Sequence, residues 1–300
     1  MEQITPDSEY RGLIAGVPAR LRGYALLARF DRPIGWWLLF WPCAFGVALA
    51  GGIAANWRLL PWLLLGSIAM RGAGCVYNDI IDRELDAKVA RTASRPLPSG
   101  QVGLTAAWIW LTALCLIGLL ILLQLRWPAQ ICALGSLALV AAYPYMKRIT
   151  WWPQAWLGLV FSWGAPVGWL AAGGAYSAAP FWLYAGCIFW VVGYDTIYAV
   201  QDKEDDALIG VRSSALRLGG HLRGGVMLFY AAALAGWGMA IWTVRPQYLA
   251  LAALIPAALH LLWQAVTLRA DGGDALEKFR ANRFTGLLMA LACLVVGASA

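Results

Sequence analysis

Ionisable side chains are scarce in this chain, because Asp, Glu, Lys and Arg make up only 13% of its 300 residues. A soluble globular domain has about 25% charged residues, so the composition excludes an ordinary soluble protein. The hydrophobic share is 61% and includes 18 Trp, which is typical of a polytopic membrane protein. The net charge of +7 therefore does not indicate nucleic-acid binding, since Lys and Arg in membrane proteins set orientation.

Residues for nucleophilic catalysis are also few. The two His residues, His221 and His260, are isolated, and no Ser/His/Asp or Cys/His set is evident. The six Cys lie scattered without a CxxC pair, so we expect small hydrophobic residues in packed helices. Residues 1–7 are acidic and lack the apolar core of a signal peptide, so none is expected.

Long apolar stretches dominate the rest of the chain, and a helix needs about 20 such residues to span a bilayer. The expected fold is all-α: a polytopic membrane protein with nine spans in a single domain, residues 1–300, without linkers. Residues 1–32 form an N-terminal segment, in which 10–32 is either a helix at the membrane surface or an ordinary basic juxtamembrane stretch. The expected spans lie near residues 33–53, 59–80, 104–123, 128–146, 154–172, 179–199, 223–243, 248–268 and 284–300.

Positive charges are distributed unevenly among the connections between these spans. All but four of the 23 Lys and Arg lie in the N-terminal segment or in the loops after every second span. Because Lys and Arg are retained on the cytoplasmic side, this pattern predicts a cytoplasmic N-terminus. The 16 Asp and Glu share the basic side, so the polar chemistry is expected on the cytoplasmic face. The four exceptions are Arg58, Arg71, Arg126 and Arg245.

A cluster of acidic and amide side chains follows the second expected span. On a helix, Asn78, Asp82 and Asp86 are spaced four residues apart, so their oxygens line one face. Mg²⁺ selects hard oxygen ligands, usually one or two carboxylates together with water and a substrate phosphate. The stretch therefore predicts a magnesium site. The alternative is a solvated acidic turn that ends a membrane helix.

A second acidic cluster follows the sixth expected span. Asp195, Asp202 and Asp206 share one helical face, and Tyr198 lies between them. The four-residue spacing of the first cluster recurs in Asp202 and Asp206, and each cluster precedes a basic loop that contains Ser or Thr. This faint internal repeat predicts two half-sites on one side of the membrane.

Two such clusters facing each other would hold two or more Mg²⁺ around a diphosphate. Nearby Lys and Arg would add hydrogen bonds to phosphate oxygens. For an allylic ester, neutralising this charge allows the C–O bond to ionise, because the carbocation is stabilised by resonance. Asn78 would complete the metal ligands, and the expected catalytic carboxylates, which also bind metal, are Asp82, Asp86, Asp202 and Asp206.

The stretches around both clusters resemble those of the UbiA superfamily of intramembrane prenyltransferases, and within it the enzymes that act on 4-hydroxybenzoate. The resemblance extends from about residue 25 to residue 220 and is far more specific than the two acidic motifs. It is carried by residues 29–35, 41–42, 74–82, 86–92, 95–97, 143–148, 161–164, 194–199, 202–206 and 209–214.

The resemblance implies nine helices around a central cavity and Mg²⁺-dependent transfer of a polyprenyl group from its diphosphate to 4-hydroxybenzoate. The new bond forms at the ring carbon ortho to the hydroxyl, which is a step of ubiquinone biosynthesis. It assigns Lys147 to the diphosphate and Arg148 to the aromatic acid. A benzoate needs a cation, and Arg offers a bidentate fork; alternatively, both residues are only anchors at the membrane surface.

Further site residues are expected on the same side of the membrane. Arg71 lies inside the second span, where a charge is expensive in lipid, so it is expected to face the cavity and bind diphosphate or an acid. We also assign Arg91 to the diphosphate, and Asp195 and Tyr198 to the aromatic substrate. Tyr198 would stabilise a carbocation through its ring face, or simply pack between helices.

Two other functions compete with this one. The first is a sister prenyltransferase that acts on another acceptor, such as a naphthoate, a haem or a chlorin. The second is a cation-coupled transporter, which would carry ionisable groups near the middle of the membrane. Because nearly all charges lie at one face, we expect an enzyme of the cytoplasmic (inner) membrane. Its expected partners are membrane lipid, polyprenyl diphosphate and 4-hydroxybenzoate, without nucleic acid or a protein partner.

Overall fold

The computed structural model describes residue 8 and residues 11–51, 56–88, 90–201, 203, 212–269 and 271–298. Side chains are described for these positions except residues 11–13, 90, 91 and 147. Contacts divide the chain into two compact units, namely residues 1–37 with 64–124 and residues 38–63 with 125–300. The single domain over residues 1–300 stays a prediction.

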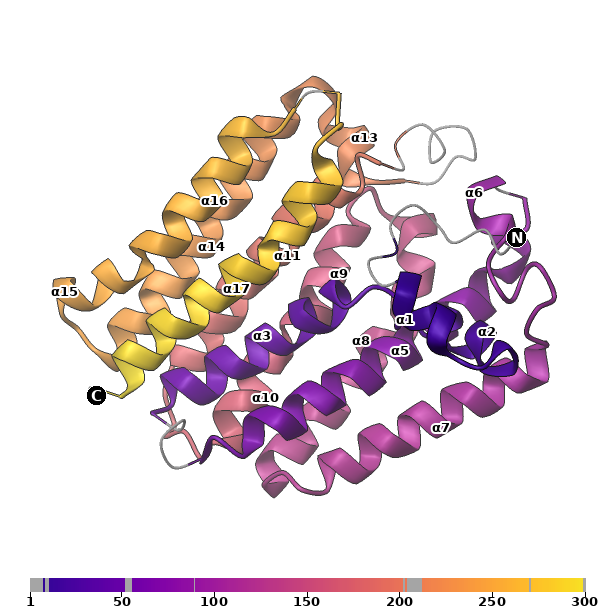
Figure 1. Ribbon diagram of the computed structural model, residues 1–300. Coiled ribbons are helices and arrows are strands. Elements are labelled where there is room, and N and C mark those ends of the chain that lie inside the picture. The colour runs from indigo at the N-terminus through magenta and orange to yellow at the C-terminus, as the bar shows by residue number, and fades with distance from the viewer. Residues whose placement is uncertain are drawn as a thin grey trace. The chain divides into compact units, whose positions relative to one another are not determined.

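Helices account for the regular structure of both units (Figure 1), which confirms the all-α prediction for the described ranges. The first unit contains α1 (Arg11–Gly16), α2 (Ala19–Leu27), most of α5 (Leu59–Asp86), α6 (Ala90–Ala93) and α7 (Leu104–Leu122). The second contains most of α3 (Ile34–Leu49), α8 (Trp127–Ile149), α9 (Pro153–Ser162), α10 (Gly164–Ala171), α11 (Ala179–Tyr198), α13 (Ser214–Leu218), α14 (Leu222–Val244), α15 (Tyr248–Leu251), α16 (Ile255–Thr267) and α17 (Ala275–Gly297), with the 3-10 turns η1 (Gly219–His221) and η2 (Ala252–Leu254).

A buried apolar cluster joins α2, α5 and α7 in the first unit. On α7, Trp110 lies edge-on to Tyr24 and Phe30 and donates its indole N–H to the Tyr24 carbonyl at 3.2 Å. Residues 10–32 therefore contain two short helices, α1 and α2, and the end of α2 packs against protein, while a position at the membrane surface stays a prediction. The cluster consists of Leu27, Ala28, Ala73, Val76, Leu97, Val102, Ala107 and Leu114.

In the second unit, α11 and α14 pack side by side (Figure 1). A Cβ atom on Gly236 of α14 would come within 2.7 Å of the Gly186 backbone on α11. Such close backbone approach at small residues is typical of helix pairs in membranes. Beside this contact, the fully buried Trp190 and Trp237 have ring centroids 5.8 Å apart. Small and large residues together thus fill the interface.

The predicted span at 154–172 is replaced by two shorter helices, α9 and α10, which meet at Trp163. Gly164 and Gly168 follow with GxxxG spacing, and a Cβ atom on either would collide with Cys43 of α3. The indole N–H of Trp163 donates to the Cys132 carbonyl of α8 at 2.7 Å. Contacts with α3 and α8 therefore determine where the span breaks.

Polar side chains are buried together among α11, α14, α16 and α17. The Gln264 amide oxygen accepts from the Tyr230 hydroxyl at 3.0 Å and from the Asn282 amide at 2.9 Å. The Gln264 amide nitrogen donates to the Thr285 hydroxyl at 3.1 Å, and Asn282 accepts the Trp190 indole N–H at 2.8 Å. These bonds satisfy groups that are costly to leave unpaired in a membrane, so they hold α17 in one register.

The last helix begins earlier than the predicted span at 284–300, because α17 already starts at Ala275. Charge counting places Lys278 in a loop, yet its side chain is only 4% exposed. Its ammonium group lies 3.4 Å from the ring centroid of Trp263 and donates to the Thr267 hydroxyl. A cation–π contact and a hydrogen bond thus replace the lost hydration.

Pro128, Pro153 and Pro180 lie in the first turns of α8, α9 and α11, where the missing N–H of proline is harmless. Pro256 lies in the first turn of α16, and the 3-10 turn η2 separates α16 from α15.

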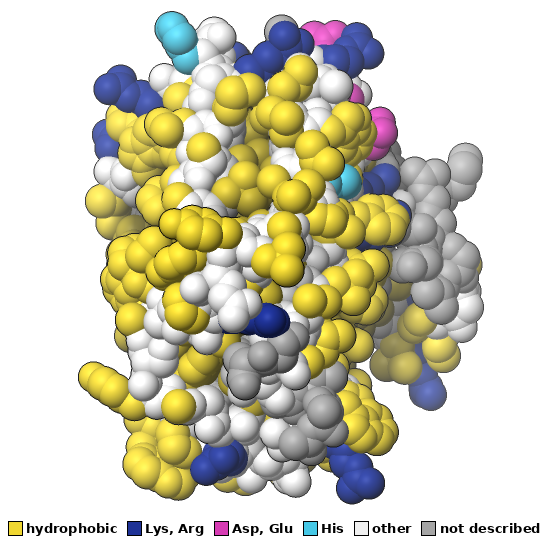
Figure 2. Space-filling view, turned by 90° about the vertical axis from the view of Figure 1, so that its left-hand side faces the viewer, with side chains coloured by type: hydrophobic (Ala, Val, Ile, Leu, Met, Phe, Trp, Pro, Cys, Tyr) yellow, Lys and Arg dark blue, Asp and Glu magenta, His cyan; other side chains and the backbone are white. Residues whose placement is uncertain are grey.

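Among the described residues, six helices are long and apolar enough to cross a membrane, so the chain is a multi-pass membrane protein. Figure 2 shows a broad hydrophobic band on the α14–α16 side, whereas the visible acidic side chains lie near the upper end. The predicted number of nine spans and the cytoplasmic N-terminus stay predictions. The six candidates are Leu59–Asp86, Leu104–Leu122, Trp127–Met146, Ser214–Val244, Tyr248–Thr267 and Ala275–Gly297.

Candidate active site

The first acidic cluster lies on the last turns of α5, which continues without a break through Asp86. Asn78, Asp82 and Asp86 therefore form the single helical stripe that their spacing predicts. Asp82 is 0% and Asp86 6% exposed, while Asn78 is half-buried. A solvated acidic turn would leave these carboxylates in water, so their burial disfavours that alternative.

Asp79, beside this stripe, binds Arg29 through both carboxylate oxygens, at 3.0 and 2.8 Å. The side chains are 2% and 11% exposed, respectively. Burial by itself would lower the pKa of Arg29, but the facing Asp79 carboxylate outweighs this effect and raises it above the ordinary value. The pair is a buried, charge-assisted contact that joins the end of α2 to α5.

Arg29 also has an unusual backbone, with φ of 57° in the left-handed region. The Phe30 N–H bonds to the Ala25 carbonyl and the Arg29 N–H to the Leu26 carbonyl, which is the Schellman pattern that ends a helix. Glycine usually takes this position, because a side chain there costs roughly 1–2 kcal/mol. An arginine at this position indicates that its side chain contributes something that glycine cannot.

Arg95 links two acids of α5. The same Nη1 atom lies 2.8 Å from Asp86 Oδ2 and 3.5 Å from Asp79 Oδ1. The turn that carries Arg95 is fixed to the helix end, because the Thr92 hydroxyl donates to the Asp86 carbonyl at 2.8 Å. Two positive and two negative side chains thus alternate along these contacts. We call them the charge array: Arg29, Asp79, Arg95 and Asp86.

Arg71 lies on the same face of α5, nearer to its start. Its guanidinium donates to the Cys75 sulfur one turn later. A Cβ atom on Gly35 would come within 2.7 Å of Arg71 Nε, so the glycine leaves space for the guanidinium. The side chain is half-buried in protein, as expected for a charge within a span. Its contact with diphosphate stays a prediction.

In the second unit, Asp195 and Tyr198 lie in the last turns of α11 and are half-buried. The Tyr198 ring is 4.6 Å from the Phe279 ring of α17, and Phe279 also contacts Tyr194 edge-on at 5.8 Å. Tyr198 therefore does pack between helices. The same contact holds its ring in place, so a role towards the aromatic substrate stays a prediction.

Three buried polar side chains connect α9, α11 and α13 close to these residues. The Thr196 and Ser214 hydroxyls are 2.7 Å apart, and the Ser214 N–H donates to the Gln154 amide oxygen at 3.1 Å. Next to them, Arg212 donates to the Ile149 carbonyl at 2.7 Å. These bonds bring the end of α8 towards the end of α11.

Arg148 is exposed in the last turn of α8, and its guanidinium carbon lies 6.0 Å from the Tyr145 ring centroid. The structure therefore gathers Arg148, Asp195 and Tyr198 near one end of the second unit. The predicted residues Asp202 and Asp206 lie outside the described positions, as do the side chains of Arg91 and Lys147.

Several residues near the ends of α5 and α11 were not predicted from the sequence. Asp79 stands inside the acidic motif, but it does not share the stripe, and nothing in its spacing indicates an arginine partner. Arg29 and Arg95 belong to stretches that carry the family resemblance, and that was the available signal. Arg212 had the same signal, since it lies within residues 209–214, whereas Phe279 had none, because its partners are distant in the chain.

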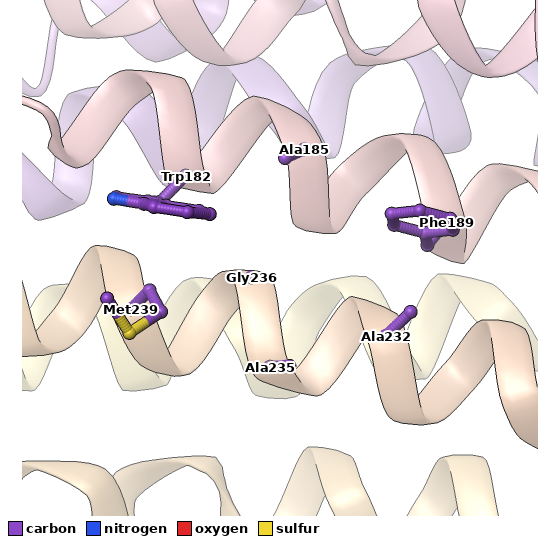
Figure 3. Close-up of a pocket in the computed structure, with 7 residues that line it drawn as sticks. All are labelled: Trp182, Ala185, Phe189, Ala232, Ala235, Gly236 and Met239. Carbon is purple, nitrogen blue, oxygen red and sulfur yellow. The ribbon is translucent and has the colours of Figure 1, made fainter.

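An apolar hollow of about 270 Å³ lies between α11 and α14 (Figure 3). None of the side chains that line it is charged, so it lacks groups to bind a diphosphate or a benzoate. The lining residues are Trp182, Ala185, Phe189, Ala232, Ala235, Gly236 and Met239.

The donor set on α5 fits magnesium, since an amide and two carboxylates offer hard oxygens on one face. Within the described ranges, no three His, Cys, Asp or Glu side chains form a complete metal site. The stripe would therefore supply only part of a ligand set, and its role as a metal site stays a prediction.

The fold and the site define a multi-pass helical membrane protein in which buried aspartates at the end of α5 contact arginines and offer oxygen donors that fit a metal ion. Residues 39–295 match the model of the UbiA prenyltransferase family. The chain belongs to this family, which disfavours the transporter alternative.

Relatives in animals support this assignment. The chain is 44% identical to the mitochondrial 4-hydroxybenzoate polyprenyltransferase of Drosophila pseudoobscura pseudoobscura, over 95% of this chain and 73% of the relative. It is 43% identical to the enzyme of the same name from Caenorhabditis elegans, over 92% and 79% of the two chains.

Solved structures show the same fold. A UbiA homolog from Aeropyrum pernix K1 superposes with a TM-score of 0.72 at 26% identity, covering 86% of this chain and 97% of that one. A homolog from Archaeoglobus fulgidus, bound to GPP and Mg²⁺, superposes with a TM-score of 0.69 at 17% identity, covering 93% and 100%.

Proposed function

We propose that the protein transfers a polyprenyl group from polyprenyl diphosphate to the ring carbon ortho to the hydroxyl of 4-hydroxybenzoate, a step of ubiquinone biosynthesis. The observation that carries the proposal is the stripe of Asn78, Asp82 and Asp86 on α5, with both carboxylates buried, in a chain 44% identical to an enzyme of that name. Relatives covered over most of their length support the same acceptor.

The stripe on α5 and the second cluster, Asp202 and Asp206, would hold Mg²⁺ and through it the diphosphate. Magnesium, when bound there, neutralises the negative charge that develops on the departing diphosphate. Lys147, Arg71 and Arg91 would add hydrogen bonds to the phosphate oxygens, and their positive charges would favour breakage of the allylic C–O bond. Asp82 is the residue whose loss should matter most, because it is fully buried at the centre of the stripe.

The acceptor would be held in the second unit. Arg148 would bind the benzoate carboxylate with its two-pronged guanidinium, which fixes the direction of the ring. Asp195 and Tyr198 would line the acceptor position, and Phe279 keeps the Tyr198 ring in place. The electron-rich ring carbon then attacks the allylic cation, and loss of the ring proton restores aromaticity.

The site lies, in this proposal, on the side of the membrane where the positive loops gather, which is the cytoplasmic side of an inner membrane. The animal relatives carry "mitochondrial" in their names, so the corresponding compartment there is the organelle. The acceptor named for these relatives favours 4-hydroxybenzoate over naphthoate, haem or chlorin.

The test is an assay of purified full-length protein with labelled 4-hydroxybenzoate and polyprenyl diphosphates of several lengths, with Mg²⁺ and with a chelator. Asp82→Asn and Asp202→Asn should each lower turnover by at least about 100-fold. Glu84→Gln is the matched control, because Glu84 lies on the same helix with its side chain 87% exposed. Near-normal turnover of Asp82→Asn would refute the metal assignment, and turnover in the chelator would refute the metal dependence.

A further inference from the structure

The charge array at the end of α5 contains a carboxylate that two cations would compete for. Asp86 belongs to the stripe that would bind Mg²⁺, yet its Oδ2 atom is 2.8 Å from Arg95 Nη1. A metal ion and a guanidinium both bind the lone pairs of a carboxylate. A metal ion bound at Asp86 would also repel the positive charge of the Arg95 guanidinium beside it. The ion pair and a metal at Asp86 therefore oppose each other.

The two arginines of the array differ in how firmly they are held. Arg29 makes two bonds to Asp79 and a third to the Leu26 carbonyl at 2.9 Å, and its side chain is 11% exposed. Arg95 reaches both acids through one nitrogen, and its side chain is 22% exposed. Arg29 is thus suited to a fixed position, whereas Arg95 is suited to a change of partner.

The backbone around Arg95 is anchored, so such a change needs only the side chain. The Arg95 N–H bonds to the Thr92 carbonyl at 3.0 Å, and the Ser99 N–H bonds to the Arg95 carbonyl at 3.0 Å. Leu97 and Val102, which follow, are 5% and 4% exposed in the apolar cluster. Movement of the guanidinium away from Asp86 would leave this turn in place, and Asp79 lies 3.5 Å away as its second partner.

We propose that Arg95 is an exchangeable counter-ion, a positioning residue that occupies Asp86 in the metal-free protein and transfers its hydrogen bonds to the diphosphate when metal and diphosphate bind together. Asp79 keeps the guanidinium within reach throughout. A planar guanidinium matches phosphate oxygens as well as it matches a carboxylate. This inference rests on the proposed function for the identity of the ligands.

The proposal predicts that Arg95→Gln changes the affinity for Mn²⁺ in opposite directions without and with diphosphate. In Arg95→Gln, one cation that competes for Asp86 is gone, so Mn²⁺ alone should bind about fivefold more tightly than in the wild type. Mn²⁺ together with inorganic diphosphate should bind about tenfold more weakly, because a donor to the phosphate oxygens is lost. Damage to the fold would weaken both.

The experiment measures Mn²⁺ binding by electron paramagnetic resonance on the full-length protein in detergent, with and without inorganic diphosphate. Arg83→Gln is the matched control, since Arg83 lies on α5 with its side chain 42% exposed and 3.8 Å from Glu84, and it should leave both affinities unchanged. Equal affinities in Arg95→Gln and wild type, or a loss of both, would overturn the proposal.

A second variant covers the case in which Arg95→Gln fails to fold. Arg95→Lys keeps the charge but not the fork, so it should bind Mn²⁺ alone as the wild type does and Mn²⁺ with diphosphate several-fold more weakly. Unchanged affinity with diphosphate would contradict an exchange. If the wild type shows the coupled binding but does not prenylate 4-hydroxybenzoate, the proposed function fails while the exchange stands.

Discussion

The Arg29–Asp79 pair offers a direct measure of how strongly the array holds the first unit together. Removing one partner of a buried ion pair typically costs 3–5 kcal/mol, because the other charge stays buried. Arg95 lies 3.5 Å from Asp79 and partly compensates for a lost Arg29. We therefore expect Arg29→Ala and Asp79→Asn each to lower the free energy of unfolding by about 3 kcal/mol.

The double variant should be less destabilised than the sum of the two single variants, with a coupling energy of about 2 kcal/mol. The backbone gives a second, independent comparison. Because Arg29 has φ of 57°, Arg29→Gly relieves strain that Arg29→Ala keeps, so the glycine variant should be more stable by about 0.5–1 kcal/mol.

Both comparisons need a denaturation midpoint for the full-length protein in detergent micelles, followed by circular dichroism. Arg83→Gln is the control for loss of an arginine near the same helix end. Additive effects of Arg29→Ala and Asp79→Asn would show that the pair is not coupled. A glycine variant less stable than the alanine variant would refute the left-handed conformation at this position.

Other parts of the molecule yield three more predictions. Gly236→Ala should destabilise the protein by about 1–3 kcal/mol, because its Cβ would meet the Gly186 backbone at 2.7 Å. Gly224→Ala on the same helix has open space and should be neutral or stabilising in the same denaturation assay. Asn282→Leu should lower the free energy of unfolding by about 1–3 kcal/mol, because the Trp190 indole N–H and the Gln264 oxygen both lose a hydrogen-bond partner. Hydrogen exchange of α17 should accelerate in this variant, and unchanged exchange would contradict the proposed role of Asn282 in the register of α17. The N–H of Gly273 and the side chain of Arg269 lower the pKa of Asp271 below its ordinary 3.8, so this carboxylate stabilises the loop after α16 above that pH and ceases to do so as the pH falls through the lowered value. The stability difference between wild type and Asp271→Asn should accordingly be present at neutral pH and vanish in acid, and a difference that grows in acid would reverse the assigned sign.

Much of the candidate site was readable from the sequence because it depends on helix geometry. Residues four apart on any α-helix share a face, so the stripe of Asn78, Asp82 and Asp86 follows from spacing once α5 continues past the apolar span. The all-helical class follows in the same way from apolar stretches near the length of a bilayer crossing. Resemblance added the reaction, which no spacing rule contains.

The tertiary structure decided which charges meet. Arg29 and Asp79 are 50 residues apart, and Trp190 and Asn282 are 92 apart, so no local periodicity connects them. Lys278 looked like a loop residue because charge predicts exposure, and only the Trp263 ring and the Thr267 hydroxyl explain its burial. Local spacing by itself therefore determined where oxygens line a helix. Folding alone decided which cations face them, because long side chains take partners from whatever element packs nearby.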